Sequence, residues 1–179
     1  MTWSIIARDG EGRFGIAIAS CFLAVGAWCA HTRRGVGAVA TQALLNPLYG
    51  PAGLDRLAAG EAPEHVIAAL IQADEGRGQR QLQVLPASGV GAAHTGGECI
   101  GWCGHQLGNG FSVAGNMLAG PEVVDASVQA YIAVAGRPLA DADQTMVDYY
   151  ARLSRAGMVN LHDLELTIVT SDAFLNRLP

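Results

Sequence analysis

The chain opens with Met1-Thr2-Trp3-Ser4-Ile5-Ile6-Ala7-Arg8-Asp9, and this stretch decides which fold we predict. Its β-branched and aromatic residues favour a strand, and the glycine-rich residues 9–13 that follow are typical of a turn. Residues 14–20 then alternate isoleucine with small residues, a pattern typical of a second strand. We therefore predict a β-hairpin over residues 3–20.

Thr2 is the first candidate for catalysis. Removal of Met1 would leave a hydroxyl and a free α-amine on this one residue. A hydroxyl needs a base to take its proton, and an α-amine with a pKa of about 7.7 to 8.0 can act as that base near neutral pH. An N-terminal threonine can thus perform the acyl chemistry of a Ser-His-Asp triad with fewer residues. The alternative is that Thr2 is an ordinary second residue with no catalytic role.

The composition predicts one globular domain spanning residues 1–179. The chain is 50% hydrophobic, enough to bury a sizeable core. Its net charge of −5 and its 15% of charged residues give no basic surface for nucleic acid or an anionic membrane. No run approaches the roughly 18 apolar residues of a membrane span and no signal-peptide pattern is present, so we expect a cytoplasmic protein. So apolar a chain with so few charges also favours a homo-oligomer.

All 11 basic residues are arginine. The absence of lysine excludes a Schiff-base lysine, a phosphate-loop lysine and a lysine general base. A G-x-G-x-x-G pattern occurs at Gly10, Gly12 and Gly15, but strand-like sequence follows it where a dinucleotide site needs the N-terminus of a helix. We therefore interpret the glycines as hairpin residues and expect no cofactor.

Hydrophobic periodicity predicts the remaining elements. Helical spacing, with proline at the start of some segments, indicates helices, and alternation bounded by glycine indicates strands. Groups of strands that alternate with groups of helices favour an α+β domain in which helices cover antiparallel sheets. We predict irregular strand over 21–37, a turn-rich loop over 44–53, helices over 53–59, 63–74, from 121 and over 139–156, a hairpin of 79–86 with 90–94, and strands over 111–117 and 164–170.

Several linked motifs within about residues 2–139 resemble a bacterial family called domain of unknown function 1028. The motifs are TWSIIARD at 2–9, FLAVG at 22–26, GVGAVATQA at 35–43, YGP at 49–51 and GNMLAGPEV at 115–123. The resemblance implies the fold of the N-terminal-nucleophile (Ntn) hydrolases, a four-layer αββα sandwich of two antiparallel sheets. It implies this fold more firmly than it implies a reaction.

The resemblance also suggests a reaction and its residues. Thr2 falls where an Ntn hydrolase places its nucleophile, so we predict hydrolysis of an amide bond in a small or peptide-like substrate. Where the proteasome-like branch has a lysine, this chain offers only arginine, which supplies positive charge but cannot relay a proton. We expect Arg34 to fill that place and Asn116 to donate to the oxyanion. His31, Arg33 and Gln42 are the predicted substrate-binding residues.

A non-catalytic protein is the alternative. The chain lacks the lysine, and residues 156–179 do not match the glycine-rich C-terminal segment usual in the family. Both departures favour a small-ligand-binding or assembly module that keeps the sandwich without the reaction.

A second group of residues has the composition of a metal site. His94, Cys99, Cys103 and His105 form an H-x4-C-x3-C-x-H pattern, and two thiolates with two imidazoles suit tetrahedral zinc. The spacing is looser than the usual C-x2-C, and all four lie within 12 residues, which is cramped. We favour the other interpretation, in which the cysteines are small buried residues, and expect no metal.

Overall fold

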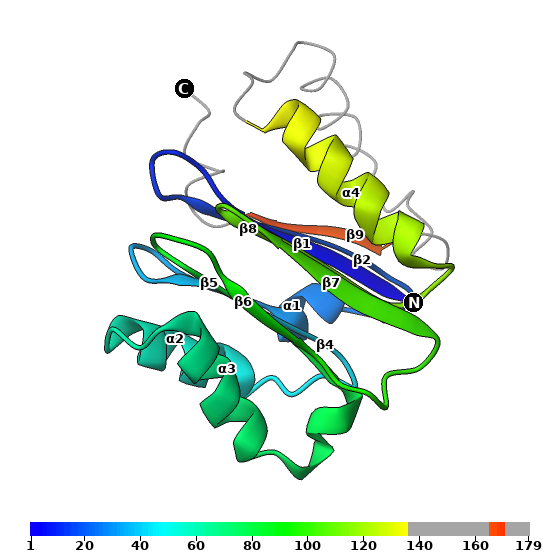
Figure 1. Cartoon of the computed structure of the whole chain (residues 1–179), viewed down its shortest axis with the longest axis horizontal. Coiled ribbons are helices and arrows are strands. Elements are labelled where there is room, and N and C mark those ends of the chain that lie inside the picture. The colour runs from blue at the N-terminus through cyan, green and yellow to red at the C-terminus, as the bar shows by residue number, and fades with distance from the viewer. Residues whose placement is uncertain (136–164, 171–179) are drawn as a thin grey trace.

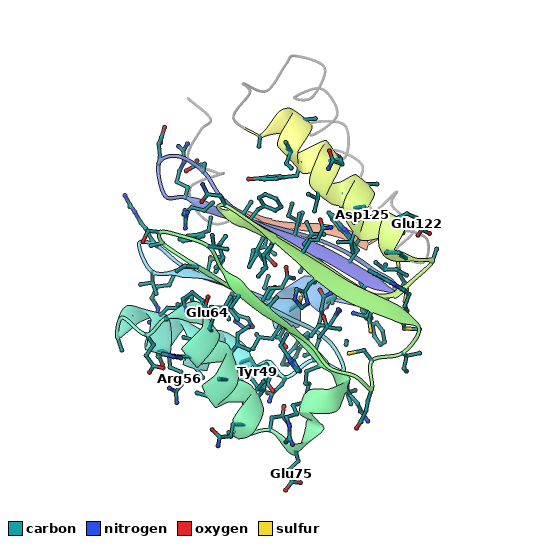
Figure 2. All side chains as sticks on the ribbon, in the orientation of Figure 1. Tyr49, Arg56, Glu64, Glu75, Glu122 and Asp125 are labelled. Atoms are coloured by element: carbon teal, nitrogen blue, oxygen red, sulfur yellow. The ribbon has the colours of Figure 1, made fainter. Side chains whose placement is uncertain are left out.

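Two antiparallel sheets lie face to face, with helices on the outer face of each (Figure 1). The structure is a computed structural model and describes residues 1–135 and 165–170. Side chains from both sheets fill the space between them (Figure 2). The layer order is helix, sheet, sheet, helix, and the predicted antiparallel α+β architecture is therefore present in the described part of the chain.

The first sheet has the strand order β7-β8-β1-β2-β9. The predicted N-terminal hairpin is confirmed, because β1 pairs with β2 from Thr2 opposite Ser20 to Arg8 opposite Phe14. On its other side β1 pairs with β8, which places the opening stretch at the centre of this sheet. The bounds are β1 (Thr2–Arg8), β2 (Phe14–Ser20), β7 (Trp102–Gly108), β8 (Phe111–Leu118) and β9 (Glu165–Thr170).

The second sheet has four strands in the order β3-β4-β5-β6. It contains the predicted second hairpin, β5 with β6. Its central strand β4 pairs along its whole length with β5, from Gly37 opposite Pro86 to Ala43 opposite Arg80. The bounds are β3 (Ala30–Arg33), β4 (Gly37–Ala43), β5 (Arg80–Pro86) and β6 (Ala92–Thr95).

Helices α2, α3 and α4 close the two outer faces, and the short α1 lies between the sheets. Helices α2 and α3 pack on the second sheet through a cluster that includes Val39, Leu54 and Val66, and α4 packs on the first sheet through Val124 and Val128. None of the helices in residues 1–135 is long and apolar enough to cross a membrane. The helical bounds are α1 (Val25–Cys29), α2 (Tyr49–Ala58), α3 (Pro63–Gln72), the 3-10 turn η1 (Glu75–Gln79) and α4 (Pro121–Val134).

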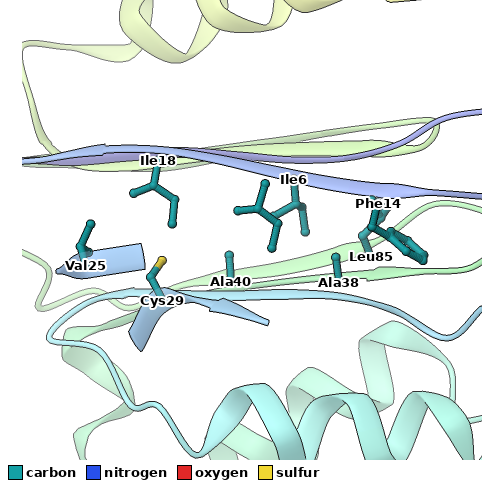
Figure 3. Close-up of a cluster of buried hydrophobic side chains, with 9 residues drawn as sticks. Ile6, Phe14, Ile18, Val25, Cys29, Ala38, Ala40 and Leu85 are labelled. Atoms are coloured by element: carbon teal, nitrogen blue, oxygen red, sulfur yellow. The ribbon is translucent and has the colours of Figure 1, made fainter. Parts of the chain in front are cut away.

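A single apolar cluster runs through the core between the sheets. Alternation along each strand sends every second side chain into this layer, so Ile6, Ile16 and Ile18 of the first sheet meet Ala38 and Leu85 of the second (Figure 3). The intervening residues of β1, including Trp3 and Ile5, face α4 instead. The hydrophobic pattern of the opening stretch therefore serves two cores, one on each face of its sheet.

Three predicted segments differ from the observed structure. The short helix α1 interrupts the region predicted as irregular strand, and α2 begins at Tyr49 within the predicted loop, since Pro51 lies in the first helical turn, where a missing N–H costs nothing. Strand β7 was not predicted, because it is an edge strand whose polar, glycine-rich sequence shows little alternation. The helix predicted over 139–156 lies outside the described residues.

Candidate functional site at the N-terminal end of β1

Thr2 lies in a row of three polar side chains that crosses the first sheet. The β1 register places it directly opposite Ser20 of β2 and opposite Asn116 of β8. Residues opposite each other in antiparallel strands project to the same face of the sheet, here the face that meets the second sheet. All three are buried. The central strand pairing thus brings together residues that are up to 114 positions apart in the sequence.

The Thr2 hydroxyl is held by Ser20. The two hydroxyl oxygens are 2.9 Å apart, and Ser20 Oγ also donates to the carbonyl of Met1 at 3.3 Å. A hydroxyl has one hydrogen, so Thr2 is the donor in the bond between them. The amino group of Met1 lies 3.6 Å from Cys21 Sγ and 3.5 Å from Met117 Sδ. Met1 therefore covers Thr2 and occupies the position next to its backbone nitrogen.

A chain of buried amides connects this row to the second sheet. Gln81 Oε1 accepts from Asn116 Nδ2 at 2.9 Å and from Gln42 Nε2 at 3.0 Å. Gln42 Oε1 in turn accepts from the Ser4 hydroxyl at 2.6 Å. Gln83 Nε2 donates to Ser4 at 2.7 Å, which extends the network along β1. Buried amides of this kind fix the spacing of the two sheets, because each needs its partner in place.

The layer between the sheets therefore contains a polar region beside its apolar cluster. The cluster extends from Phe14 and Leu85 at the Arg8 end to Val25 and Cys29 at the Ser20 end (Figure 3). At the Thr2 end the inward positions of five strands are polar. These positions are Thr2 of β1, Ser20 of β2, Gln42 of β4, Gln81 of β5 and Asn116 of β8.

A cavity of about 260 Å³ lies at the polar end. Asn116 lines it directly, so the cavity adjoins the row that contains Thr2. Four of its lining side chains are large, apolar and exposed, and Glu98 is the one charged side chain among the described residues that line it. The apolar four are Phe22, Leu44, Ile100 and Met117.

The backbone is strained on two sides of this cavity. Ala43 has a φ of 67° and Met117 a φ of 55°, both in the left-handed region that non-glycine residues avoid. Each directly follows an inward polar residue, Gln42 and Asn116. Strain of this kind persists where the surrounding structure enforces it, and it is concentrated at binding and catalytic sites. It supports this end of the sandwich as the functional one.

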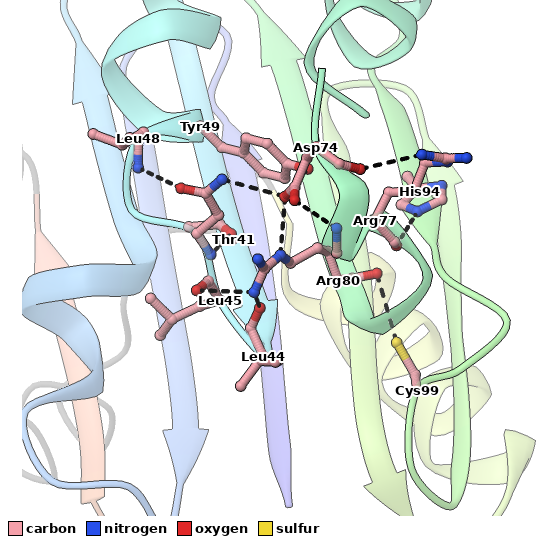
Figure 4. Close-up of polar contacts among 12 residues, drawn as sticks. Thr41, Leu44, Leu45, Leu48, Tyr49, Asp74, Arg77, Arg80, His94 and Cys99 are labelled. Atoms are coloured by element: carbon pink, nitrogen blue, oxygen red, sulfur yellow. Dashed lines mark hydrogen bonds and ion pairs between the residues drawn. The ribbon is translucent and has the colours of Figure 1, made fainter. Parts of the chain in front are cut away.

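A charged cluster holds the loop that follows Ala43. Arg80 Nε lies 3.0 Å from Asp74 Oδ2, and the Arg80 guanidinium also donates to the Leu44 carbonyl (Figure 4). The Tyr49 hydroxyl donates to Asp74 at 2.7 Å. The hydrogen bond from Arg80, together with those from Tyr49 and the Gly76 N–H, lowers the pKa of Asp74. Burial and the neighbouring Asp74 carboxylate raise the pKa of Tyr49.

Residues 2–142 match a family of unknown function, DUF1028. The chain belongs to this family. A crystal structure of a Silicibacter pomeroyi protein assigned to DUF1028 is similar to it, with 32% identity and a TM-score of 0.72. The similarity covers 78% of this chain and 64% of the other protein, so the DUF1028 chain spans less than two thirds of that protein's length. Comparison with curated proteins finds no match. The predicted family is thereby confirmed.

The structure of this DUF1028 chain brings three of the predicted site residues together. Thr2 and Asn116 are paired across the sheet, and Gln42 joins them through Gln81. Gln42 is fully enclosed, however, so it supports the site and does not line the cavity.

Arg33 and Arg34 lie at the other end of the sandwich. Arg33 pairs with Gly37, Gly37 pairs with Pro86, and the Pro86 carbonyl accepts from Arg8 at the far end of β1. Arg33 forms an exposed ion pair with Asp55 at 2.8 Å, and Arg34 is exposed in the turn that follows. The predicted approach of Arg34 to Thr2 does not occur. The reason is the direction of β3, which runs away from the Thr2 end.

His31 faces the helix layer. It pairs with Val39, which belongs to the cluster under α2 and α3, and a Cβ at position 50 of α2 would overlap its ring. Its Nε2 lies 3.2 Å from the Trp28 carbonyl. His31 is therefore on the face of the second sheet that points away from Thr2.

The two His residues of the predicted metal pattern are bonded to separate partners. His94 Nε2 lies 3.0 Å from the Arg77 carbonyl, and His105 Nδ1 lies 2.9 Å from the Thr95 hydroxyl. Cys99 lines the cavity, and its pKa is raised by burial and by the nearby Cys103 thiol. Within residues 1–135 and 165–170, no group of three or more His, Cys, Asp or Glu side chains is arranged to hold a metal ion.

Three supporting residues were not predicted from the sequence. Ser20 could have been found from the hairpin alone, because pairing Arg8 with Phe14 across the turn also pairs Thr2 with Ser20. Gln81 and Gln83 alternate with Leu82 in a predicted strand, which indicates a polar face, but only the packing of the two sheets shows that this face is buried.

Proposed function

We propose that the protein is an Ntn-type amide hydrolase with an Ntn-hydrolase-like fold, and that Thr2 becomes its nucleophile when Met1 is removed. The observation that carries the proposal is the position of the Thr2 hydroxyl. It is buried at the end of the central strand, bonded to Ser20 and adjacent to Asn116, which lines the cavity.

The reaction uses two groups of Thr2. Its α-amine takes the hydroxyl proton as Oγ1 attacks the carbonyl carbon, and the proton then passes to the nitrogen of the breaking C–N bond. The amine product leaves and an ester remains on Thr2. Water attacks the ester, gives a proton to restore the hydroxyl, and releases a carboxylic acid. Loss of Met1 also removes the carbonyl to which Ser20 donates, so the Ser20 hydrogen becomes available at the site.

Asn116 is suited to stabilise the oxyanion. A side-chain amide carries two N–H groups, and Asn116 gives one to Gln81. The second is available to a ligand oxygen in the cavity. The Asn116 amide is fixed by a buried partner, and fixed donors of this kind stabilise developing charge without reorganisation.

Intact mass and a covalent probe test the proposal. Protein purified without an N-terminal tag is expected to lack Met1. A β-lactone should then acylate Thr2, forming an ester as its ring opens, and peptide mapping should locate the adduct on the N-terminal peptide. Thr2→Ser is expected to keep the labelling and Thr2→Ala to lose it. Retention of Met1, or labelling that persists in Thr2→Ala, contradicts the mechanism.

A non-catalytic binding module is the second candidate. The positions of Arg33 and Arg34 favour it, because no basic side chain among the described residues lines the cavity beside Thr2. In that case the β-lactone leaves Thr2 unlabelled, while small ligands still bind in the cavity.

A further inference from the structure

The cavity beside Asn116 combines one exposed carboxylate with an apolar wall. Phe22, Leu44 and Ile100 are 61%, 59% and 72% exposed, which is unusual for large apolar side chains that share one hollow. A ligand that covers them gains the free energy of removing apolar surface from water. The wall therefore selects an apolar group.

Glu98 is held at the edge of this wall. Its backbone N–H donates to the Gly78 carbonyl at 2.7 Å, and its Oε2 accepts from Gln79 Nε2 at 3.4 Å. Its carboxylate also lies against Gly78, since a Cβ at that position would come within 2.8 Å of Glu98 Cδ. Oε1 has no such partner among the described residues, so one carboxylate oxygen is available to a ligand.

The Arg80 guanidinium is engaged by partners other than Glu98. Arg80 is bonded to Asp74 and to the carbonyls of Leu44 and Leu45. The described lining of the cavity thus carries one negative charge and no positive charge. Such a lining attracts an amine and repels a carboxylate or phosphate.

Size limits the ligand further. The cavity holds about 260 Å³, below the roughly 300–1,000 Å³ of sites for drug-sized ligands. It accommodates one large side chain with a short polar group, and not an extended oligomer.

We infer that the cavity binds an apolar aminoacyl group, with its side chain against Phe22, Leu44 and Ile100 and its α-ammonium at Glu98. The substrate class is then an apolar amino-acid amide, either free or at the N-terminus of a peptide. This assignment rests on the proposed function for its reaction, but the binding selectivity stands on the cavity alone.

Binding is measured first, in Met1-free Thr2→Ala protein that cannot form the ester. Leucinamide, Leu-Gly-Gly, N-acetyl-leucinamide and N-succinyl-leucinamide are titrated by NMR. The two amine-bearing ligands are expected to bind about threefold to fivefold tighter than the acetylated one, the range of an exposed ion pair, and the succinylated one most weakly. Leucinamide and Leu-Gly-Gly are compared with each other as well. Whichever of the two binds more tightly shows whether the cavity prefers a free amino-acid amide or the N-terminus of a peptide. Equal binding of the acetylated ligand overturns the inference.

Glu98→Gln tests the carboxylate. Glu98 is exposed, so the substitution does not threaten folding, and it is expected to reduce the preference for the amine to within about twofold. Glu64→Gln is the matched control, because Glu64 is exposed on α3 in the outer helix layer (Figure 2). It should keep the full preference. Loss of the preference in both variants, or in neither, contradicts a role for Glu98.

Hydrolysis of the same ligands by protein with native Thr2 separates the two proposals. Selective binding without hydrolysis supports the cavity assignment and contradicts the nucleophile. Hydrolysis that favours acetylated or succinylated amides supports the nucleophile and contradicts the assigned substrate class.

Discussion

Gln81 holds the polar layer beneath Thr2 together. Its Oε1 accepts from both Asn116 and Gln42, and its Nε2 donates to the Gly115 carbonyl at 2.8 Å. The side chain is fully buried. It therefore fixes the orientation of Asn116, the predicted oxyanion donor, and at the same time links the two sheets.

Replacing Gln81 with methionine should destabilise the protein and disturb the site together. The change keeps the volume but leaves two buried N–H donors without acceptors, so we expect a loss of about 2–4 kcal/mol in the free energy of unfolding. Chemical denaturation measures the loss. Gln72→Met, at an exposed position of α3, is expected to stay within about 0.5 kcal/mol of wild type. A Gln81→Met protein as stable as that control would show that the network contributes little.

The loop between β4 and α2 is the element that shapes the cavity. It contributes Leu44, and its carbonyls are bound by Arg80, which Asp74 orients. Asp74 comes from the end of the α3 region and Arg80 begins β5, so the cluster connects the helix layer to the sheet. The loop position therefore depends on an ion pair, and ion pairs depend on pH.

Asp74→Asn should remove part of the stability that wild type loses in acid. The pKa of Asp74 is lowered by folding, so its contribution is complete above the ordinary value of 3.8 and is lost as the pH falls through the folded value. Denaturation midpoints measured from pH 7 to pH 2 should fall less steeply below about pH 4 in the variant than in wild type. The variant should already be less stable at pH 7. Asp125→Asn, on the exposed face of α4, is the control. A variant that keeps the full wild-type acid slope contradicts this role.

The whole sandwich contains both a stabilising apolar cluster and the candidate site. The apolar cluster between the sheets contains Ile6, Ile18 and Leu85, and the thiol of Cys29 is so enclosed in it that burial raises its pKa to about 12. The polar end contains the Thr2 row, the strained Ala43 and Met117, and the cavity. Packing in the apolar cluster supports the less stable backbone conformations of Ala43 and Met117.

Ile18→Ala should show where the stability lies. Ile18 is fully buried between the sheets, and removing its side-chain atoms leaves a cavity that costs about 3–4 kcal/mol. Ile132→Ala is the matched control, because Ile132 of α4 is 55% exposed, and it should change the free energy of unfolding by less than about 0.5 kcal/mol. Equal effects of the two substitutions would place the stabilising core elsewhere.

Local patterns predicted most of the elements correctly. The hairpin of β1 with β2 follows from alternation and turn glycines, and α3 follows from Pro63 and helical spacing. The edge strand β7 and the start of α2 did not follow, because neither is marked by hydrophobic periodicity. Periodicity reports burial on one face, and segments without such a face leave no signal.

The sequence by itself determined the family, the antiparallel hairpins and the presence of a threonine that can become N-terminal. Tertiary structure decided which residues share its surroundings. It placed Ser20 and Asn116 next to Thr2, with Gln81 bonded to Asn116, and it placed Arg34 and His31 away from Thr2. The physical reason is that pairing between distant segments sets the direction of each strand and decides which face of a sheet is turned toward the other sheet. Sequence patterns record only what is local.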